Sequence, residues 1–225
     1  MIQYIADIEQ ACIALKELVS ESEIGLDIET TGLDPILDKI RLVQISTPLN
    51  TYVIDMYHVP ISVLNPVLTG GPIKVIHNAK FDEGFLYAAP DGVMAEPIFD
   101  TMITDQVLHH RGYGRSLKDL SKEYLDIDLD KEEQTSDWEA EHLSEAQIQY
   151  AAQDANVLLP LKHIQEERAV ELQITSVVNL ENRLVPAICW MERSGVNLDR
   201  HLWDEVVKSA EAKAVQLKEE LNMSV

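Results

Sequence analysis

The sequence predicts an α/β protein in which a mixed β-sheet is covered by helices. Three strand-like segments follow one another early in the chain, and a fourth lies later, between helical segments. Adjacent strands followed by a strand between helices are typical of such a sheet. The 225 residues are 46% hydrophobic, an ordinary fraction for a globular protein, so a folded core is expected rather than disorder.

The first expected helix begins after Asp7, a residue type that caps helix N-termini. Its apolar residues recur with helical spacing, at Ile8, Cys12, Leu15 and Val19. Three strands are expected next because turn residues separate three apolar, β-branched segments. These strands cover residues 24–29, 40–46 and 51–55.

Beyond the third strand the sequence becomes mainly helical. A short helix over residues 61–68 leads to a strand over residues 73–77. Further helices are expected over residues 79–88, 101–110, 117–124 and 145–166. The last of them begins at a capping box formed by Ser144 and Gln147.

A different unit is expected to begin near residue 171. The chain would then consist of a domain over residues 1–170 and a helical extension over residues 171–225. A long helix of the extension ends at Gly195, which suits the left-handed position after a helix, and Asp199 caps a last helix. Two helices would not fold alone, so the extension either packs on the first domain or belongs to something larger.

Composition excludes several classes of protein. The two cysteines, Cys12 and Cys189, rule out a disulfide framework, so a reducing, cytoplasmic location is expected. No apolar run reaches the ~18–20 residues of a membrane span, and no signal-peptide pattern follows Met1, so no membrane association is expected. The net charge of −21 and the pI near 4.5 argue against general binding to nucleic acid.

Two acidic residues stand at the end of the first expected strand. Asp27 and Glu29 share one face of that strand because side chains alternate along it. Such a pair is costly beside apolar residues unless a cation lies between the carboxylates. Oxygen ligands suit Mg²⁺ or Mn²⁺ rather than zinc. Taken alone, a pair of this kind is more often simply solvated.

Two later segments carry further candidate residues. Asp82 lies in the first turns of its helix, where the helix dipole favours an acidic residue. Tyr150 and Asp154 are four residues apart and share a helix face. The phenol could hold a water molecule beside a metal ion, or the helix could be an ordinary amphipathic one. Asp100 is expected to cap a helix rather than to bind metal.

Together these segments resemble the three exonuclease motifs of the DEDD superfamily, in its Tyr-containing subclass (DEDDy). The matching segments are Asp27-x-Glu29, Asn78-x-x-Phe81-Asp82 and Tyr150-x-x-x-Asp154. Their order and spacing are similar to those of ribonuclease D and of the 3′–5′ proofreading domains of family A (bacterial polymerase I type) DNA polymerases. The resemblance extends over about residues 1–169.

The resemblance implies a ribonuclease H-like fold, with a mixed five-stranded sheet flanked by helices. It also implies that Asp27, Glu29, Asp82 and Asp154 bind two divalent cations, Mg²⁺ or Mn²⁺, around the scissile phosphate. Ions ~3.5–4 Å apart can stabilise both the attacking and the leaving oxygen of an in-line displacement. Tyr150 would orient the attacking water, and 5′-mononucleotides would leave from the 3′ end.

The same resemblance suggests residues that bind substrate. Leu33 would lie beside the terminal base, unless it simply packs, and Thr30 follows the first motif. Asn78 would bond the terminal nucleotide, cap the helix that follows it, or do both. Arg115 and Lys118 belong to a basic stretch that could follow the phosphates or be merely solvated.

The segment over residues 181–203 bears on the choice of substrate. It is similar to the start of the thumb subdomain of family A polymerases, whereas ribonuclease D continues into a different helical domain. Single-stranded DNA 3′ ends are therefore the expected substrate, with a polymerase body as a partner in cis or in trans. A ribonuclease D-like exoribonuclease is one alternative. The other is a catalytically silent interaction module, against which the complete set of four carboxylates and one tyrosine speaks.

Overall fold

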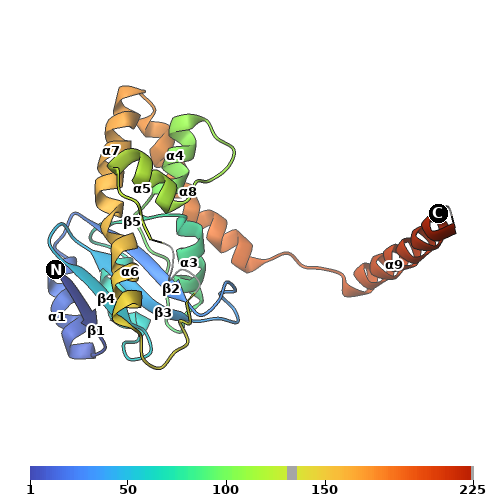
Figure 1. The fold of residues 1–225 in the computed structure, drawn as a ribbon, viewed down its shortest axis with the longest axis horizontal. Helices are drawn as coiled ribbons and strands as arrows, with labels where there is room; N and C mark the ends of the chain where they lie inside the picture. The colour runs from blue at the N-terminus through green and yellow to red at the C-terminus, as the bar shows by residue number, and fades with distance from the viewer. Residues whose placement is uncertain (131–135, 224–225) are drawn as a thin grey trace. The chain divides into compact units, whose positions relative to one another are not determined.

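The strands of the computed structural model, which describes residues 1–130 and 136–223, form one mixed sheet (Figure 1). In chain order the strands are β1 Ile2–Ile5, β2 Glu23–Thr30, β3 Ile40–Ser46, β4 Thr51–Asp55, β5 Ile73–Ile76 and β6 Ile98–Asp100. Their order across the sheet is β1-β4-β3-β2-β5-β6. The pairs β2–β3 and β3–β4 are antiparallel, and the other three pairs are parallel. The predicted mixed sheet is confirmed.

The number of strands differs from the expected five, because the described chain has six. The four strands predicted from the pattern are present, and β1 and β6 are additional. β1 has four residues and β6 has three, and each pairs in parallel at one edge of the sheet. Segments this short carry too little periodicity to be recognised, and pairing with a neighbouring strand makes them extended.

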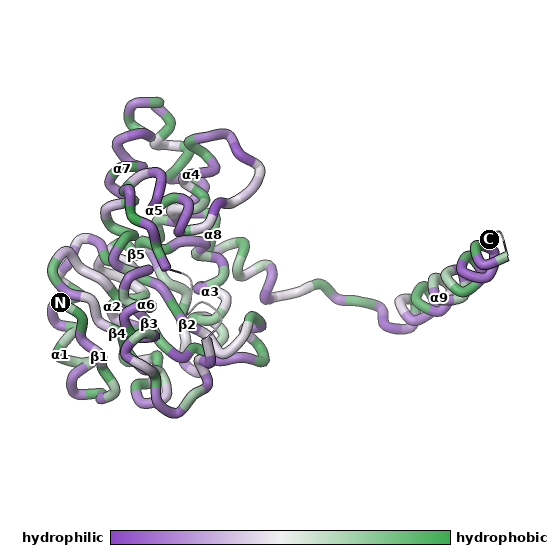
Figure 2. Tube along the Cα trace, in the orientation of Figure 1, coloured by the Kyte–Doolittle hydropathy of each residue, from purple (hydrophilic) through white to green (hydrophobic). Residues whose placement is uncertain are grey.

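Helices cover both faces of the sheet. They are α1 Ile8–Leu18, α2 Asn65–Leu68, α3 Ala79–Ala88, α4 Thr101–His109, α5 Leu117–Leu125, α6 Glu145–Asn156, α7 Leu158–Glu171, α8 Thr175–Ser194 and α9 Arg200–Met223, with a 3₁₀ turn at Ile61–Leu64. Ile24, Leu26 and Ile28 of β2 share a buried cluster with residues of α1 and α3. On the other face, α6 contacts β2, β3 and β4. Figure 2 shows strands rich in hydrophobic residues and helices in which hydrophobic and hydrophilic residues alternate.

The helix expected over residues 145–166 is in fact two helices, α6 and α7, with Val157 between them. Pro160 explains the break. A proline has no N–H to donate to the carbonyl four residues earlier, and its ring collides with that carbonyl, which here belongs to Asn156. The proline was visible in the sequence, so this boundary could have been predicted.

The chain divides into two compact units, Met1–Trp190 and Met191–Val225. The first unit extends beyond the boundary expected at residue 170, because Val178, Asn182, Val185 and Cys189 of α8 are buried in it. In the second unit, Gly195 has a φ of 66°, and the Asp199 carboxylate caps α9 by accepting from His201 N and Leu202 N. Over the described residues, no helix is both long enough and apolar enough to span a membrane.

Candidate active site

The first two carboxylates of the site come from β2, next to its antiparallel partner β3. Asp27 lies opposite Gln44 and Glu29 opposite Leu42, so both carboxylates are on the face covered by α6. The register between the strands shifts after Glu29, at Thr30, where the paired part of β2 ends. β2 therefore carries the two carboxylates to the edge of a covered face, as the alternation of side chains predicts.

Asp82 reaches the same region from α3. It lies in the first turn of the helix and is 3% exposed. The N-terminus of α3 is capped by a residue from another element, since the Asp100 carboxylate accepts hydrogen bonds from Asn78 N (3.2 Å) and Ala79 N (2.7 Å). The same carboxylate also caps α4, accepting from Met102 N (2.8 Å) and Ile103 N (3.1 Å). Asp100 thus holds two helix N-termini together, which confirms its expected capping role.

Asn78 occupies the N-cap position of α3 in the left-handed conformation, with φ 61° and ψ 48°. Its side chain makes no capping hydrogen bond, because the Asp100 carboxylate already takes the backbone N–H groups there. The alternative that the Asn78 side chain caps α3 is therefore wrong.

Asp154 and Tyr150 are brought to β2 by α6, which packs unusually close to the sheet at Gly25. A Cβ atom at Gly25 would lie 2.3 Å from Ser46 Oγ and 2.6 Å from Ala155 O. Ser46 Oγ donates a hydrogen bond of 2.7 Å to that same carbonyl. Only glycine allows this approach, so the residue two positions before Asp27 determines how near α6 comes to the carboxylates.

The four carboxylates interact electrostatically. Burial raises the pKa of Asp27 well above its usual value, and the charge of Asp154 raises it further. The pKa of Glu29 is raised by burial and by the charges of Asp27 and Asp154. For Asp82, burial and the charge of Asp27 raise the pKa. Carboxylates that oppose each other's ionisation in this way favour a bound cation.

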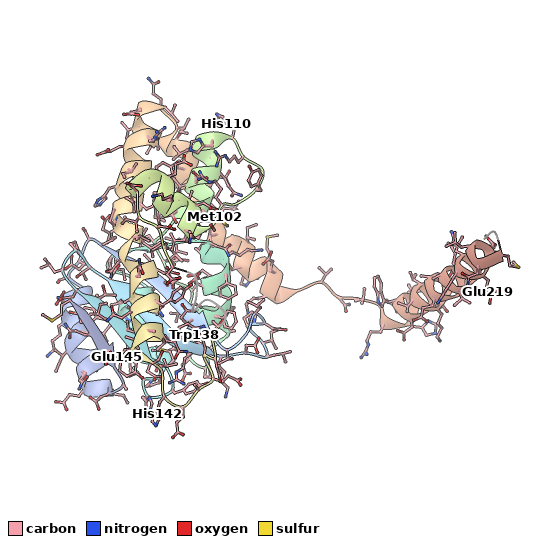
Figure 3. All side chains as sticks on the ribbon, in the orientation of Figure 1. Met102, His110, Trp138, His142, Glu145 and Glu219 are labelled. Atoms are coloured by element: carbon pink, nitrogen blue, oxygen red, sulfur yellow. The ribbon has the colours of Figure 1, made fainter. Side chains whose placement is uncertain are left out.

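Tyr150 completes this group. Its hydroxyl shares a hydrogen bond with Asp154, and burial together with the charges of Asp154, Glu29 and Asp27 raises its pKa. The phenol therefore keeps its proton at neutral pH. The ring lies 6.4 Å, between centroids, from the buried ring of Trp138 beside α6 (Figure 3). That contact limits how far the phenol can turn.

A cleft of about 370 Å³ opens beside these residues. Of the residues expected in the site, those that line it are Asp27, Asn78, Arg115, Lys118, Tyr150 and Asp154. Its other lining residues are His77, Met102, Gly114, Ser116, Leu117, Leu129 and Asp130, of which Figure 3 labels Met102. Glu29 and Asp82 are not among its lining residues. They are linked to the cleft through Asp27, whose charge affects both of them.

The two basic residues of the cleft have acidic partners. Arg115 Nη2 lies 2.5 Å from Glu123 Oε2, and Arg115 Nη1 lies 3.7 Å from Asp105 Oδ1. Lys118 Nζ lies 3.1 Å from Asp128 Oδ1. Both residues thus line the cleft with their charges partly balanced, and their contact with phosphates stays a prediction.

The remaining two expected residues lie outside the cleft. Thr30 Oγ1 donates a hydrogen bond of 2.6 Å to Gly32 O, which stabilises the turn after β2. Leu33 follows in that turn and is 84% exposed, so it does not pack as an ordinary core residue.

One residue of the cleft was assigned no role from the sequence. His77 ends the β5 region, lines the cleft, and has its Nδ1 2.9 Å from Thr101 Oγ1. Its position directly before Asn78 is the signal that could have placed it there.

The donor set fits divalent cations in chemistry, because it consists of carboxylate oxygens whose charges oppose one another. In the part of the chain that the structure describes, no three acidic, histidine or cysteine side chains already surround a common point as the ligands of one ion would.

Comparison with known proteins agrees with this geometry. The family model for a 3′–5′ exonuclease matches residues 2–168. DNA polymerase I of Aquifex aeolicus is 42% identical over 161 residues, which is 71% of this chain and 26% of the polymerase. Ribonuclease D of Pseudomonas paraeruginosa is 33% identical over 167 residues, which is 70% of this chain and 42% of that protein. The chain thus spans less than half the length of either relative.

One solved structure is similar to this chain over most of the length of both proteins. Brucella melitensis NrnC with bound Mg²⁺ has a TM-score of 0.72 and 26% identity, covering 86% of this chain and 92% of that one. Another structure shows NrnC bound to pGG.

Proposed function

We propose, on the premise that this chain belongs to the 3′–5′ exonuclease family, that it removes 5′-mononucleotides from the 3′ ends of single-stranded DNA with the help of two divalent cations. The observation that carries this proposal is the cleft in which Asp27, Tyr150 and Asp154 come together from β2 and α6. Glu29 and Asp82 adjoin Asp27 and complete the set of four carboxylates.

Asp27, Glu29, Asp82 and Asp154 would hold the cations, Mg²⁺ or Mn²⁺. When bound, such ions polarise phosphoryl oxygens and lower the pKa of a water molecule toward neutrality. The Tyr150 hydroxyl, protonated and hydrogen-bonded to Asp154, would orient the attacking water. This division of roles needs no other general base among the described residues of the cleft.

The wall of the cleft would hold the end of the strand. The Asn78 side chain, which is not used for capping, faces the cleft and can hydrogen-bond the terminal nucleotide. Arg115 and Lys118 also line the cleft, where they would contact phosphates in exchange for their acidic partners. Thr30, at the end of β2, and Leu33, in the turn that follows, would contact the terminal nucleotide.

DNA is favoured over RNA by the degree of similarity, 42% identity to a DNA polymerase against 33% to a ribonuclease. A 3′–5′ exoribonuclease is the second candidate, supported by the ribonuclease D relative and by the NrnC structure that contains pGG. The helical extension over residues 171–225 would be the start of a polymerase thumb, and the activity would then be proofreading during DNA replication.

The test uses labelled DNA and RNA oligonucleotides of the same sequence, incubated side by side with Mg²⁺, Mn²⁺ or EDTA. We expect metal-dependent shortening of DNA from the 3′ end, lost in EDTA and in the double variant Asp27→Ala, Glu29→Ala. A matched double variant, Glu9→Ala with Glu171→Ala, removes two exposed carboxylates instead and should retain activity. Faster shortening of RNA would establish the second candidate, and activity in the Asp27 and Glu29 double variant would refute the site.

A further inference from the structure

Gln44 lies in the middle of β3 and is completely buried. Neither of its side-chain polar atoms, Nε2 or Oε1, has a hydrogen-bond partner within residues 1–130 and 136–223. A buried polar group without a partner destabilises the fold, so an unpaired amide in the centre of a sheet requires a reason.

The register of the sheet places Gln44 directly opposite Asp27. Residues opposite each other in an antiparallel pair share a face, and their Cβ atoms are roughly 4.5–5.5 Å apart. On its other side Gln44 lies opposite Val53, which has no polar side-chain atom. Asp27 is therefore the polar side chain that the neighbouring strands bring beside the amide.

The donor and acceptor groups of the Gln44 amide narrow the choice of partner further. Its NH₂ group needs an acceptor. Trp138, in the buried cluster that includes Leu42 and Val53, also has an unpartnered polar atom, but indole Nε1 only donates. Ser46, two residues further along β3, already uses its proton in a hydrogen bond to Ala155 O. Of the residues directly opposite Gln44 on the two neighbouring strands, Asp27 is the one with a side-chain acceptor.

We propose that Gln44 is a positioning residue for Asp27. Its NH₂ group hydrogen-bonds the Asp27 carboxylate when that carboxylate binds a divalent cation, and holds it in the binding orientation. The amide has no partner in the metal-free protein and gains one in the metal-bound protein. The inference rests on the metal site of the proposed function.

This role differs measurably from a merely structural one. A structural glutamine stabilises the metal-free fold, so replacing it lowers the stability of that fold. An unpaired amide does the opposite, because an apolar side chain of the same shape removes a buried polar group at little cost. Loss of a group that orients a metal ligand typically weakens metal binding by about 10–100-fold.

The experiment compares Gln44→Met with Gln165→Met by calorimetric titration with Mn²⁺ and by urea unfolding in EDTA. Gln165 is also completely buried and its Oε1 has no partner among the described residues, but its NH₂ group is used: Nε2 donates to Thr101 O (2.8 Å), so this amide already has a structural role. We expect Gln44→Met to bind Mn²⁺ about 10–100-fold more weakly without losing metal-free stability. Gln165→Met should lose stability and keep the wild-type Mn²⁺ affinity.

A measurement on the unsubstituted protein covers the case in which Gln44→Met does not fold. The side-chain amide resonances of Gln44 should shift when Mg²⁺ is added, and those of Gln165 should not. The role of Gln44 would be overturned if Gln44→Met bound Mn²⁺ with wild-type affinity. It would also be overturned if the Gln44 resonances did not shift in protein that binds Mg²⁺. Failure of the wild-type protein to bind either ion would instead overturn the metal site itself.

Discussion

The protonation state of the Tyr150 hydroxyl matters to its proposed role of orienting the attacking water. The hydroxyl hydrogen-bonds Asp154, and the nearby charges of Glu29 and Asp27 raise its pKa. The hydroxyl therefore remains a donor over the whole neutral range. A donor fixed in this way can hold a water molecule in line with a phosphate, but it contributes little to holding the strand.

Replacing Tyr150 by Phe should lower kcat by about 10- to 100-fold, the effect of losing a hydrogen bond to a charged group worth about 1.5–3 kcal/mol. KM for a DNA oligonucleotide should change by less than about 2-fold, because the phenol acts on the water and not on the strand. Steady-state kinetics measure both. Tyr87→Phe, at an exposed position of α3, is the control. A large rise in KM with kcat unchanged would assign Tyr150 to substrate binding instead.

At this scale the sequence predicted which residues meet in the cleft better than it predicted their surroundings. Asp27, Tyr150 and Asp154 could be grouped because the order and spacing of the three segments together resemble the motifs of one family. Gln44 could not, because β3 is buried along its whole length and a glutamine in an apolar strand has no distinctive spacing. Its significance depends on the register between β2 and β3, which long-range pairing determines.

Among the elements, α6 has the position that most affects the site. Its approach to β2 depends on the absence of a side chain at Gly25. Gly25→Ala should therefore push α6 outward, lower the free energy of unfolding by about 1–3 kcal/mol, and reduce exonuclease activity as Asp154 moves away from Asp27. Urea unfolding and oligonucleotide shortening measure the two effects.

The matched control for that variant is Gly70→Ala, because a Cβ atom at Gly70 would meet no atom within 4 Å. This control should leave stability and activity almost unchanged. If Gly25→Ala behaved like Gly70→Ala, the contact between α6 and β2 would be more adaptable than the distances at Gly25 indicate.

The junction of α3 and α4 depends on one carboxylate. Asp100 accepts from N–H groups of both helices, whereas Asp7 caps only α1, at an exposed position. Asp100→Ala should therefore cost about 1–4 kcal/mol of unfolding free energy, and Asp7→Ala about 0.5–1 kcal/mol. Chemical denaturation of both variants gives the comparison. Equal losses would mean that Asp100 holds only one of the two helices.

Helix boundaries were predictable where a side chain determines them locally. The capping box of Ser144 and Gln147 is present as expected, because both of its hydrogen bonds form within one turn. The N-terminus of α3 was not predictable in this way. Its cap comes from Asp100, more than twenty residues further along the chain, and only the pairing of β5 with β6 brings that residue close.

For the whole molecule, the position of the domain boundary has a direct test. Val178, Asn182 and Val185 of α8 are buried in the first unit, and the Asn182 side chain accepts a hydrogen bond from Asp100 N. A chain ending at residue 190 should therefore unfold at the same urea concentration as the full chain. A chain ending at residue 170, the boundary expected from the sequence, should unfold at a lower concentration, because it exposes the surfaces that α8 covers. Equal midpoints for both truncated chains would show that α8 contributes nothing to the first unit.

The ion pairs of Arg115 and Lys118 affect how the affinity for a nucleic-acid strand depends on ionic strength. Arg115 is paired with Glu123 and Lys118 with Asp128, so a phosphate bound by either residue, as proposed, would release its carboxylate to solvent. The released carboxylates would attract cations from the solution. The nucleic-acid strand, in contrast, releases cations when it binds. That release alone would give a slope of about −0.7 per phosphate in a plot of log affinity against log salt concentration for single strands. The two effects oppose each other. The affinity should accordingly fall less steeply with rising ionic strength than the number of basic side chains in the cleft would suggest.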